Sequence, residues 1–459
     1  MFEIDELLKK VKRIHMIGIG GSGMCPLAEI LYHEGYLLSG SDNNETDNLA
    51  RIRGMGIPVV LGQSAENIRG AEMIVYTAAL LPDNPELVAA KASGIPTFER
   101  AELFGAVTRL YDNCYCVCGT HGKTTVTSML TQIMLECGRD PSCVIGGKLP
   151  LTGTNGRVGK TQTMVCEACE FKDTFLSLAP DVAIILNVDA DHLEYFKNID
   201  NIILSFHKFA GMATKALIIN GDDTNTMKAV EGVEGKDVVK FGFGSGNDIT
   251  AENIIMDHAF AHFELVKRGL KVGKVELKVP GRHNVLNALA ALAAADYEGI
   301  PLEEAIASLE RFGGAARRFE VLARINGLTI ADDYAHHPAE LKVTLDSAME
   351  MGYNRVWAVF QPFTYSRTKE FMDEFADVLK IPDRCVMTEI MGSREVNTEG
   401  VYTSQLAAKI PGSVWFNTFG EVADYVLANA ESGDLIITLG CGDIYKAAKL
   451  MIKKLKEKE

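Results

Sequence analysis

The segment Gly119-Thr-His-Gly-Lys-Thr-Thr125 has residue types that can bind the phosphates of a nucleotide. Backbone N–H groups of such a loop surround phosphate oxygens, Lys123 can reach the terminal phosphates, and the Thr124 hydroxyl can bind Mg²⁺. The standard pattern has a glycine five positions before Gly122, and this chain has Val117 there. An apolar run precedes the segment and a helical pattern follows it, which still predicts a phosphate-binding loop.

A second glycine-rich segment, Gly18-Ile-Gly-Gly-Ser-Gly23, fits the pattern G-x-G-x-x-G between a predicted strand and a predicted helix. Its glycines let the backbone approach a diphosphate, and Asp42, at the end of the next predicted strand, can reach a ribose hydroxyl. The segment therefore predicts a site for a dinucleotide or a nucleoside diphosphate. A turn that serves only tight packing is the alternative.

Acidic and histidine side chains follow two other predicted strands. Glu167 ends one strand, and Asp189-Ala-Asp-His192 follows another. If these strands are neighbours in a parallel sheet, the side chains gather at its carboxyl edge and can hold Mg²⁺ against a phosphate. His192 has the alternative role of an ordinary loop histidine.

Two further polar groups lie beyond residue 280. Asn284 and Asn287 share one face at the start of a predicted helix, although Asn284 alone could be a helix cap. Asp332-Asp-Tyr-Ala-His-His-Pro338 is a dense polar cluster just after a predicted strand. Both groups are candidates for contacts with a nucleotide or a substrate.

Predicted strands alternate with predicted helices along the chain, and these elements must position the motifs. The alternation predicts an α/β fold of three domains: a Rossmann-like domain at 1–107, a central phosphate-loop domain at 108–315 and a Rossmann-like domain at 316–459. Period-two runs at 240–280 predict a small antiparallel appendage, and the glycine-rich, basic segment Arg311–Arg318 predicts a hinge. The predicted strands include Arg13–Ile19, Tyr36–Ser39, Met73–Thr77, Tyr115–Cys118, Met164–Glu167, Val182–Asn187, Ala216–Asn220, Val356–Phe360, Arg384–Thr388 and Leu435–Leu439.

The composition limits the class of protein. The chain has 459 residues and a formal net charge of −15, which argues against sequence-independent binding of nucleic acid or an anionic membrane. We expect no signal peptide, and no run reaches the ~20 apolar residues of a membrane-spanning helix. Ten cysteines in a chain of this length predict buried or free thiols and a cytoplasmic location. The single C-x-x-C motif, Cys166–Cys169, lacks the second pair that zinc requires.

The order of these motifs resembles that of the Mur ligases, the cytoplasmic enzymes that build the stem peptide of peptidoglycan precursors. The resemblance spans nearly the whole chain. Its matching segments are Gly18–Met24, Gly40–Asp42, Gly119–Thr125, Asp189–His192, Gly281–Ala291, Arg317–Glu320, Asp332–Pro338 and Phe360–Lys369.

The resemblance implies a role for each matching residue. The UDP-sugar would contact Gly18, Gly20, Gly21, Ser22, Gly23, Met24 and Asp42. ATP would contact Gly119, Thr120, His121, Gly122, Lys123, Thr124, Thr125, Asn284, Asn287 and Asp333. Magnesium would be held by Thr124, Glu167 and His192, the amino acid by His336, His337 and Arg367, and catalysis would depend on Lys123, His192 and Arg318.

The activity that the resemblance implies is an ATP-dependent ligation with Mg²⁺ as cofactor. The carboxylate of UDP-N-acetylmuramate would attack the γ-phosphate of ATP, and the amine of L-alanine would attack the resulting acyl phosphate. The partners would be small molecules only, and the enzyme would be a monomer or a homodimer. Phe363 stands where this family usually has a histidine, so the identity of the added amino acid stays open. Cys169 and Lys172 interrupt a run that is usually acidic in this family, and Glu170 is therefore a second candidate for the metal ligand.

Other functions remain as alternatives. A related muramate ligase would add a different amino acid or a recycled peptide. An NAD-dependent oxidoreductase would use the first glycine motif but has no need of Gly122-Lys-Thr124. A protein that binds nucleotide only as a switch would need few of the polar residues named above.

Overall fold

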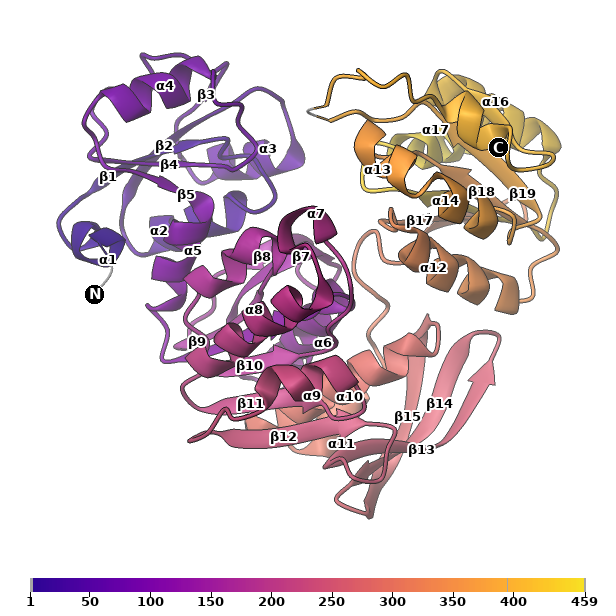
Figure 1. Ribbon diagram of the computed structural model, residues 1–459, viewed down its shortest axis with the longest axis horizontal. Coiled ribbons are helices and arrows are strands. Elements are labelled where there is room, and N and C mark those ends of the chain that lie inside the picture. The colour runs from indigo at the N-terminus through magenta and orange to yellow at the C-terminus, as the bar shows by residue number, and fades with distance from the viewer. Residues whose placement is uncertain (1–2, 394, 458–459) are drawn as a thin grey trace. The chain divides into compact units, whose positions relative to one another are not determined.

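The computed structural model describes residues 3–393 and 395–457. Three sheets, of five, ten and six strands, organise the chain (Figure 1). The chain divides into two compact units. The first consists of Met1–Glu252, Glu264–Val275 and Leu286–Phe312, and the second of Asn253–Phe263, Glu276–Val285 and Gly313–Glu459.

The N-terminal sheet has the order β3-β2-β1-β4-β5, and all its strands are parallel. Successive side chains of β1 point to opposite faces, so Met16 packs with the core residues of α2 and α5 while Ile17 packs with Ala90 of α4. This is the predicted doubly wound arrangement. The elements are α1 (Glu3–Leu8), β1 (Arg13–Ile17), α2 (Cys25–His33), β2 (Leu37–Asp42), α3 (Asp47–Gly54), β3 (Val59–Leu61), β4 (Met73–Tyr76), α4 (Pro85–Ala92), β5 (Thr97–Glu99) and α5 (Arg100–Thr108).

The central sheet has the order β15-β14-β13-β12-β11-β10-β6-β9-β7-β8. Strand β6 lies between β10 and β9 and is parallel to both, so the residues that follow these three strands meet at one edge. The elements up to β11 are β6 (Asn113–Cys118), α6 (Lys123–Glu136), β7 (Ser142–Leu149), β8 (Thr154–Arg157), β9 (Thr163–Glu167), η1 (Phe171–Ser177), β10 (Val182–Ile185), α7 (Leu193–Phe196), α8 (Ile199–Met212) and β11 (Ala216–Asn220).

Three strands occupy most of the segment predicted as an antiparallel appendage. They are β13 (Ile249–Asp257), β14 (Phe260–Lys267) and β15 (Leu270–Pro280), neighbours joined by tight turns, as antiparallel pairing requires. They extend the central sheet instead of forming a sheet of their own, because β13 pairs in parallel with β12 (Asp237–Gly242). The other elements here are α9 (Thr224–Val230), α10 (His283–Tyr297) and α11 (Leu302–Leu309).

The C-terminal sheet has the order β16-β17-β21-β18-β19-β20, with β16 antiparallel to β17 and the other pairs parallel. Helices pack on both faces, since one core cluster contains Leu341 of α12 and the other contains Ala447 of α17. The elements are β16 (Glu320–Ile325), β17 (Leu328–Asp333), α12 (Pro338–Glu350), β18 (Val356–Phe360), α13 (Tyr365–Glu370), α14 (Met372–Val378), β19 (Arg384–Thr388), α15 (Thr403–Ala407), β20 (Val414–Phe416), α16 (Phe419–Asn429), β21 (Leu435–Leu439) and α17 (Tyr445–Lys456).

The predicted α/β fold class is confirmed, and β11, β18, β19 and β21 have the predicted bounds. The first predicted strand is two residues too long, because Gly18 has φ +80° and turns the chain after Ile17. The last of the boundaries between the two compact units follows Phe312, inside the segment predicted as a hinge. The domain boundaries at 107 and 315 stay predictions. No helix in the described part of the chain is long and apolar enough to cross a membrane.

Candidate active site

The phosphate loop connects β6 to α6 through a short turn that begins at Gly119 and ends at Gly122. Gly122 has φ +87°, and a Cβ there would lie 2.5 Å from Oδ1 of Asn287 in α10. Val117 is fully buried within β6, so the chain has not yet left the sheet where the standard pattern has its first glycine. The loop is therefore shorter than the standard one, which explains how Val117 is accommodated.

Asn187, two residues after β10, holds the phosphate loop in place. Its Oδ1 accepts a hydrogen bond from the N–H of His121 at 2.8 Å, and its Nδ2 donates to the His121 carbonyl at 3.1 Å. Its own carbonyl accepts from the N–H of Thr120 at 3.1 Å. These contacts shape the loop before any ligand binds. Asn187 is not among the predicted site residues, although its place two residues before Asp189, at the end of a predicted strand, is a usable signal.

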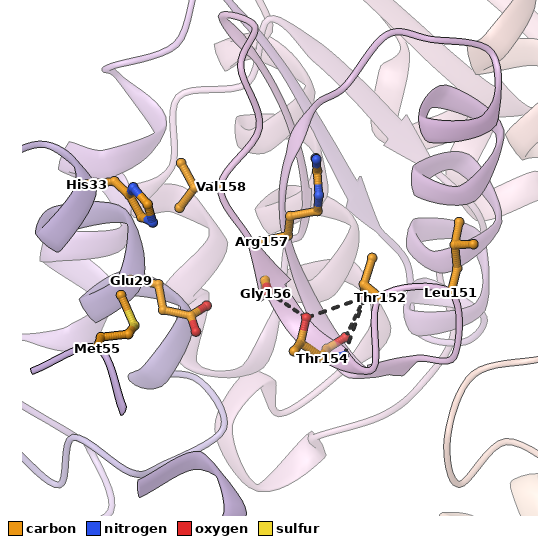
Figure 2. Close-up of a pocket in the computed structure, with 9 residues that line it drawn as sticks. All are labelled: Glu29, His33, Met55, Leu151, Thr152, Thr154, Gly156, Arg157 and Val158. Carbon is orange, nitrogen blue, oxygen red and sulfur yellow. Dashed lines mark hydrogen bonds between the residues drawn. The ribbon is translucent and has the colours of Figure 1, made fainter. Parts of the chain in front are cut away.

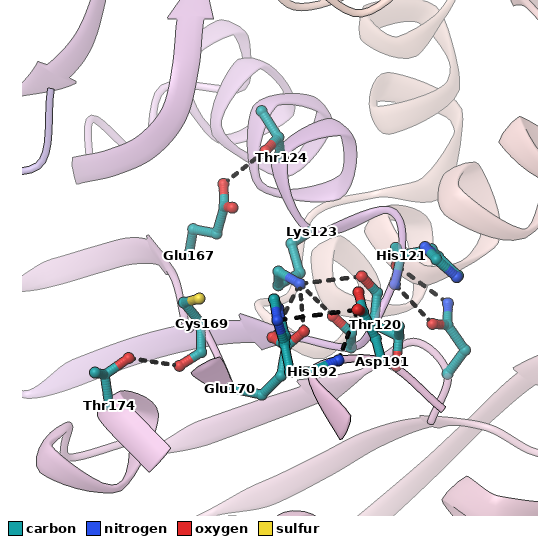
Figure 3. Close-up of polar contacts among 12 residues, drawn as sticks. Thr120, His121, Lys123, Thr124, Glu167, Cys169, Glu170, Thr174, Asp191 and His192 are labelled. Atoms are coloured by element: carbon teal, nitrogen blue, oxygen red, sulfur yellow. Dashed lines mark hydrogen bonds and ion pairs between the residues drawn. The ribbon is translucent and has the colours of Figure 1, made fainter. Parts of the chain in front are cut away.

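Lys123 lies at the centre of the contacts in Figure 3. Its Nζ donates to the carbonyl oxygens of Gly119 at 2.6 Å and Thr120 at 3.1 Å, and it lies 2.9 Å from Oε2 of Glu170. Burial opposes the ammonium charge, but the negative charges of Glu170 and Glu167 raise the pKa of Lys123 above its ordinary value. Lys123 is therefore a fixed cation at the start of α6.

Thr124 and Glu167 meet beside this lysine, as the sequence predicts. The Thr124 hydroxyl donates to Oε2 of Glu167 at 2.9 Å, and the N–H of Gly146 donates to the same oxygen at 2.8 Å. A Cβ at Gly146 would lie 2.5 Å from that oxygen, so the glycine leaves room for the carboxylate. A hydroxyl and a carboxylate are hard oxygen donors of the kind that Mg²⁺ prefers. Glu170, the second candidate ligand, instead pairs with Lys123.

His192 begins α7 in the left-handed conformation, with φ 54° and ψ 39°. Its ring packs against Phe171, with centroids 4.6 Å apart, and Nδ1 lies 3.4 Å from Oε1 of Glu194 and 3.9 Å from Oδ1 of Asp191. No compact group of three His, Cys, Asp or Glu ligand atoms within the described residues includes His192. Its role as a metal ligand stays a prediction.

The one such group in the described residues consists of Cys114, Cys116 and Cys166. Their sulfur atoms lie 3.6 Å (Cys114 to Cys116) and 3.5 Å (Cys116 to Cys166) apart in the hydrophobic core. Burial raises the pKa of the Cys116 thiol, which keeps it protonated. All ten cysteines are free, which confirms the prediction of buried or free thiols.

The two predicted asparagines differ in position. Asn287 lies against Gly122 of the phosphate loop, where the prediction requires it. Asn284 donates through Nδ2 to the carbonyl of Pro280 at 2.7 Å, a contact at the start of α10. That contact matches the alternative of a helix-end role, and binding of ATP by Asn284 stays a prediction.

The second glycine-rich loop connects β1 to α2. A Cβ at Gly18 would lie 2.5 Å from Cγ2 of Thr77, so the close approach requires glycine. The N–H of Gly20 donates to Oδ2 of Asp42 at 3.0 Å, and Oδ1 accepts from the N–H groups of the next two residues at 2.8 and 3.2 Å. Asp42 therefore shapes the loop, and its contact with a ribose stays a prediction.

Met24 follows the glycines of this loop. Its side chain is 1% exposed and belongs to the hydrophobic core, so it supports the loop, and a contact of its backbone with the UDP-sugar stays a prediction. The β7–β8 hairpin contacts the same loop. Nδ2 of Asn155 donates to the carbonyl of Ser22 at 2.7 Å, and a Cβ at Gly156 would lie 2.4 Å from Cβ of Pro26 in α2.

A cavity of about 460 Å³ lies between α2 and this hairpin (Figure 2). Glu29 and His33 of α2 and Arg157 of β8 line it. Burial raises the pKa of Glu29, although the Arg51 charge, 2.6 Å away, lowers it. The cavity contains none of the predicted site residues, and neither glycine loop lines it.

In the second unit, Asp333 ends β17 and is buried. Its Oδ2 accepts from the N–H of Phe319 and its Oδ1 from the N–H of Ala335, both at 2.7 Å. Burial raises the pKa of Asp333 to about 6, although the Arg318 charge and these two hydrogen bonds lower it. Arg318 and Asp333 are therefore close, as the predicted nucleotide contacts require. The Arg318 guanidinium also lies 5.3 Å from the centre of the Tyr334 ring.

The residues predicted to bind the amino acid also lie in the second unit. His337 is the N-cap of α12 and packs against Phe371, with ring centroids 4.7 Å apart. Nδ1 of His336 lies 3.2 Å from Oε2 of Glu340. The Arg367 side chain has no hydrogen bond or ion pair with any residue that the structure describes, so its charge is available to a carboxylate.

Comparison with known proteins gives the family. Residues 13–112 match the model "Mur ligase family, catalytic domain", residues 117–295 the "Mur ligase middle domain", and residues 317–442 the "Mur ligase, glutamate ligase domain". The chain is 43% identical to UDP-N-acetylmuramate–L-alanine ligase of Agathobacter rectalis, covering 99% of this chain and 100% of that one. It is 41% identical to the enzyme of that name from Caldanaerobacter subterraneus subsp. tengcongensis, with the same coverage.

Solved structures agree with the sequence comparison. The UDP-N-acetylmuramate–alanine ligase MurC of Thermotoga maritima aligns with a TM-score of 0.84 and 27% identity, over 97% of this chain and 100% of that chain. The murein peptide ligase of Psychrobacter arcticus shares the fold, with a TM-score of 0.76, 24% identity and coverage of 97% and 99%. The family models lie in the order that the motifs predict, and the relatives match over their full length. The chain belongs to the Mur ligase family.

Proposed function

We propose that the protein joins L-alanine to the lactyl carboxylate of UDP-N-acetylmuramate, with hydrolysis of ATP, in the synthesis of peptidoglycan precursors. The observation that carries this proposal is the presence, in one compact unit, of two glycine-rich loops that each connect a strand to a helix, at Gly18–Gly23 and Gly119–Gly122. A ligase that uses a sugar nucleotide and ATP needs both loops. An NAD-dependent oxidoreductase would leave the second one, with Lys123, unexplained. The names of the full-length relatives support the same substrates.

The first loop is proposed to bind the UDP-sugar and the second to bind ATP. Backbone N–H groups at the start of α2 and α6 point toward the phosphates in such loops, and Lys123 supplies a positive charge. Thr124 and Glu167 would hold Mg²⁺, since their oxygens already meet through a hydrogen bond. The bound metal would neutralise charge on the phosphates. His192 is proposed as a further ligand.

The proposed reaction needs no nucleophile from the protein. A carboxylate oxygen of the sugar attacks the γ-phosphorus of ATP, the bond to the β-phosphate oxygen breaks, and ADP leaves. The amine of L-alanine then attacks the carbonyl carbon of the acyl phosphate, loses a proton, and inorganic phosphate leaves with the electron pair of its C–O bond. Lys123 and Arg318 would stabilise the charge on the transferred phosphoryl group, so positioning and electrostatics supply the acceleration.

The second unit is proposed to supply the amino-acid site and part of the nucleotide site. Arg367, which has no partner in the described chain, would bind the carboxylate of L-alanine through its planar guanidinium. His336 and His337 would lie near the incoming amine, and Asp333 would contact the nucleotide. We also propose a cytoplasmic location, because ATP and UDP-sugars are cytoplasmic substrates.

The proposal is tested by phosphate release from ATP in the presence of Mg²⁺ and UDP-N-acetylmuramate. Phosphate should appear only when an amino acid is added, and L-alanine should give the highest kcat/KM of the twenty. Because Phe363 departs from the family pattern, glycine and L-serine are the informative competitors. Release without the UDP-sugar, or no release with any amino acid, would contradict the proposal. A higher kcat/KM with a peptide would favour the recycling ligase instead.

A further inference from the structure

Arg100, the first residue of α5, lies against the glycine-rich loop of the first unit. A Cβ built on Gly23 would lie 3.2 Å from Cδ of Arg100 and 3.4 Å from both Nε and Nη1. The guanidinium group therefore packs directly on the last glycine of the loop. A glycine at this position leaves the space that the arginine occupies.

The Arg100 guanidinium group has no hydrogen-bonded partner in the part of the chain that the structure describes. Its side chain makes no hydrogen bond or ion pair with any residue in the described part of the chain. The nearest acidic residues in sequence, Glu99 and Glu102, form the capping box of α5, in which the N–H of Glu99 donates to Oε2 of Glu102. Burial lowers the pKa of Arg100, although Cys169 and Glu99 raise it. A partly buried cation without a hydrogen-bonded anion costs free energy, so this charge is a poor source of folding stability.

Free backbone donors lie beside the guanidinium group. The N–H of Gly20 is bonded to Asp42 and that of Gly21 to the carbonyl of Gly18. The N–H groups of Ser22 and Gly23 have no acceptor among the residues that the structure describes. These two N–H groups precede α2, whose dipole also favours an anion at this end. Within the described residues, an arginine without a hydrogen-bonded partner thus lies against Gly23, next to two backbone N–H groups without an acceptor.

We propose that Arg100 binds the diphosphate of the sugar nucleotide, which it holds against the N–H groups of Ser22 and Gly23. A guanidinium group suits this task because its planar donors can bind two phosphate oxygens at once. The proposal rests on the proposed function, and it adds a specificity-determining residue that no motif of the sequence analysis contains. It also explains why the chain retains an arginine that does not stabilise its fold.

The test compares Arg100→Gln, Arg100→Lys and the control Arg69→Gln in the full-length protein. Arg69 is an exposed arginine of the same sheet domain, 3.7 Å from Glu66. Calorimetry measures the binding of UDP and of uridine to each protein. Arg100→Gln should weaken UDP binding by about tenfold or more and leave uridine binding unchanged, because a hydrogen bond to a charged group contributes about 1.5–3 kcal/mol. Arg100→Lys, which keeps the charge but loses the planar donors, should weaken it less.

Steady-state kinetics and melting temperatures complete the test. The KM for UDP-N-acetylmuramate should rise in Arg100→Gln while the KM for ATP stays within twofold of the wild type, and Arg69→Gln should change neither. The melting temperature of Arg100→Gln should stay the same or rise, because an unpaired buried charge is removed. Both Arg100 variants melting well below Arg69→Gln would show a structural role and overturn the proposal.

Two other outcomes are distinguishable. Unchanged UDP binding with weaker binding of UDP-N-acetylmuramate would mean that Arg100 binds the sugar carboxylate and not the diphosphate, which also overturns the proposal. If the wild-type protein itself binds neither UDP nor UDP-N-acetylmuramate, the proposed function fails. A wild type that ligates normally, with Arg100 variants that behave as Arg69→Gln does, refutes only the role of Arg100.

Discussion

The ammonium group of Lys123 and the carboxylate of Glu170 form an ion pair that is almost closed to solvent. Nζ lies 2.9 Å from Oε2, and the two side chains are 14% and 4% exposed. The three protons of Lys123 are already directed at Glu170 and at two carbonyl oxygens of the phosphate loop. If Lys123 binds the γ-phosphate as proposed, the phosphate must replace one of these acceptors, and Glu170 would hold the lysine in position until then.

The different positions of Glu167 and Glu170 predict different responses to magnesium. Glu167→Gln should raise the Mg²⁺ concentration for half-maximal velocity by about tenfold or more, because Glu167 is the carboxylate that meets Thr124. Glu170→Gln should change this concentration much less and should act on the KM for ATP instead. Phosphate-release rates over a Mg²⁺ titration measure both. The opposite ranking of the two variants would make Glu170 the metal ligand.

Removal of the Lys123 amine should abolish turnover and spare the sugar nucleotide. Lys123→Ala should lower kcat by about 10³-fold or more, because a fixed charge at the transferred phosphate is lost. UDP binding, which depends on the other glycine loop, should stay within twofold of the wild type by calorimetry. Loss of both properties would mean that one of the two nucleotide sites is placed wrongly.

Two glycines at opposite ends of α6 make a matched pair. Gly122→Ala should destabilise the protein and weaken ATP binding, because the new methyl group would lie 2.5 Å from Oδ1 of Asn287 in a left-handed conformation. The backbone at Gly138 is also left-handed, with φ +74°, but nothing lies within 4 Å of the Cβ that Gly138→Ala would add. It should cost about 1 kcal/mol of unfolding free energy and leave the KM for ATP unchanged. Equal effects on ATP binding would argue against a special role for Gly122.

Burial of Asp333 predicts a stability that decreases as pH rises toward neutrality. Its pKa is raised from 3.8 to about 6 in the folded protein, so the folded state binds more protons than the unfolded state in this interval. A contribution of up to about 3 kcal/mol, fully present below about pH 4, should be lost as pH rises through about 6. Asp333→Asn should flatten this dependence, although it also loses a hydrogen bond and lowers stability overall.

Urea unfolding between about pH 4.5 and 7 measures this effect. Both tryptophans of the chain, Trp357 and Trp415, lie in the second unit, so their fluorescence reports on the unit that contains Asp333. Asp424→Asn, which changes an exposed carboxylate of the same unit, is the control and should keep the wild-type slope. An unchanged slope in Asp333→Asn would show that another group titrates.

Much of the fold follows from local sequence patterns. Short apolar runs between turn residues predicted strands such as Ala216–Asn220 and Val356–Phe360 with the observed bounds, because buried parallel strands read as continuous apolar segments. The continuity of β13 with the central sheet was not predictable in the same way. Strand pairing depends on contacts between segments, and an alternating pattern does not identify its neighbour.

The candidate site likewise contains residues that the sequence predicts and residues that it does not. Gly122 and Lys123 were predicted because their chemistry requires those residue types at that spacing. Asn187 and Arg100 are not predictable in this way, because their roles depend on contacts with distant segments. Asn187 bonds to the loop that follows another strand, and Arg100 packs on Gly23, which lies 77 positions earlier in the chain. Met24 was predicted by its place in a motif, and it is buried because the helix that follows the loop turns this side chain into the core.

The contact between Gly156 and Pro26 restricts how segments of the chain could be exchanged with those of relatives. Any side chain at position 156 would overlap the proline of α2, since its Cβ would lie within 2.4–2.9 Å of three atoms of Pro26. A chimaera that took residues 13–112 from one ligase and the remainder from another would thus have to match the hairpin to the incoming helix. Evolutionary change in sugar-nucleotide recognition would meet the same constraint, with the β7–β8 hairpin and α2 changing together.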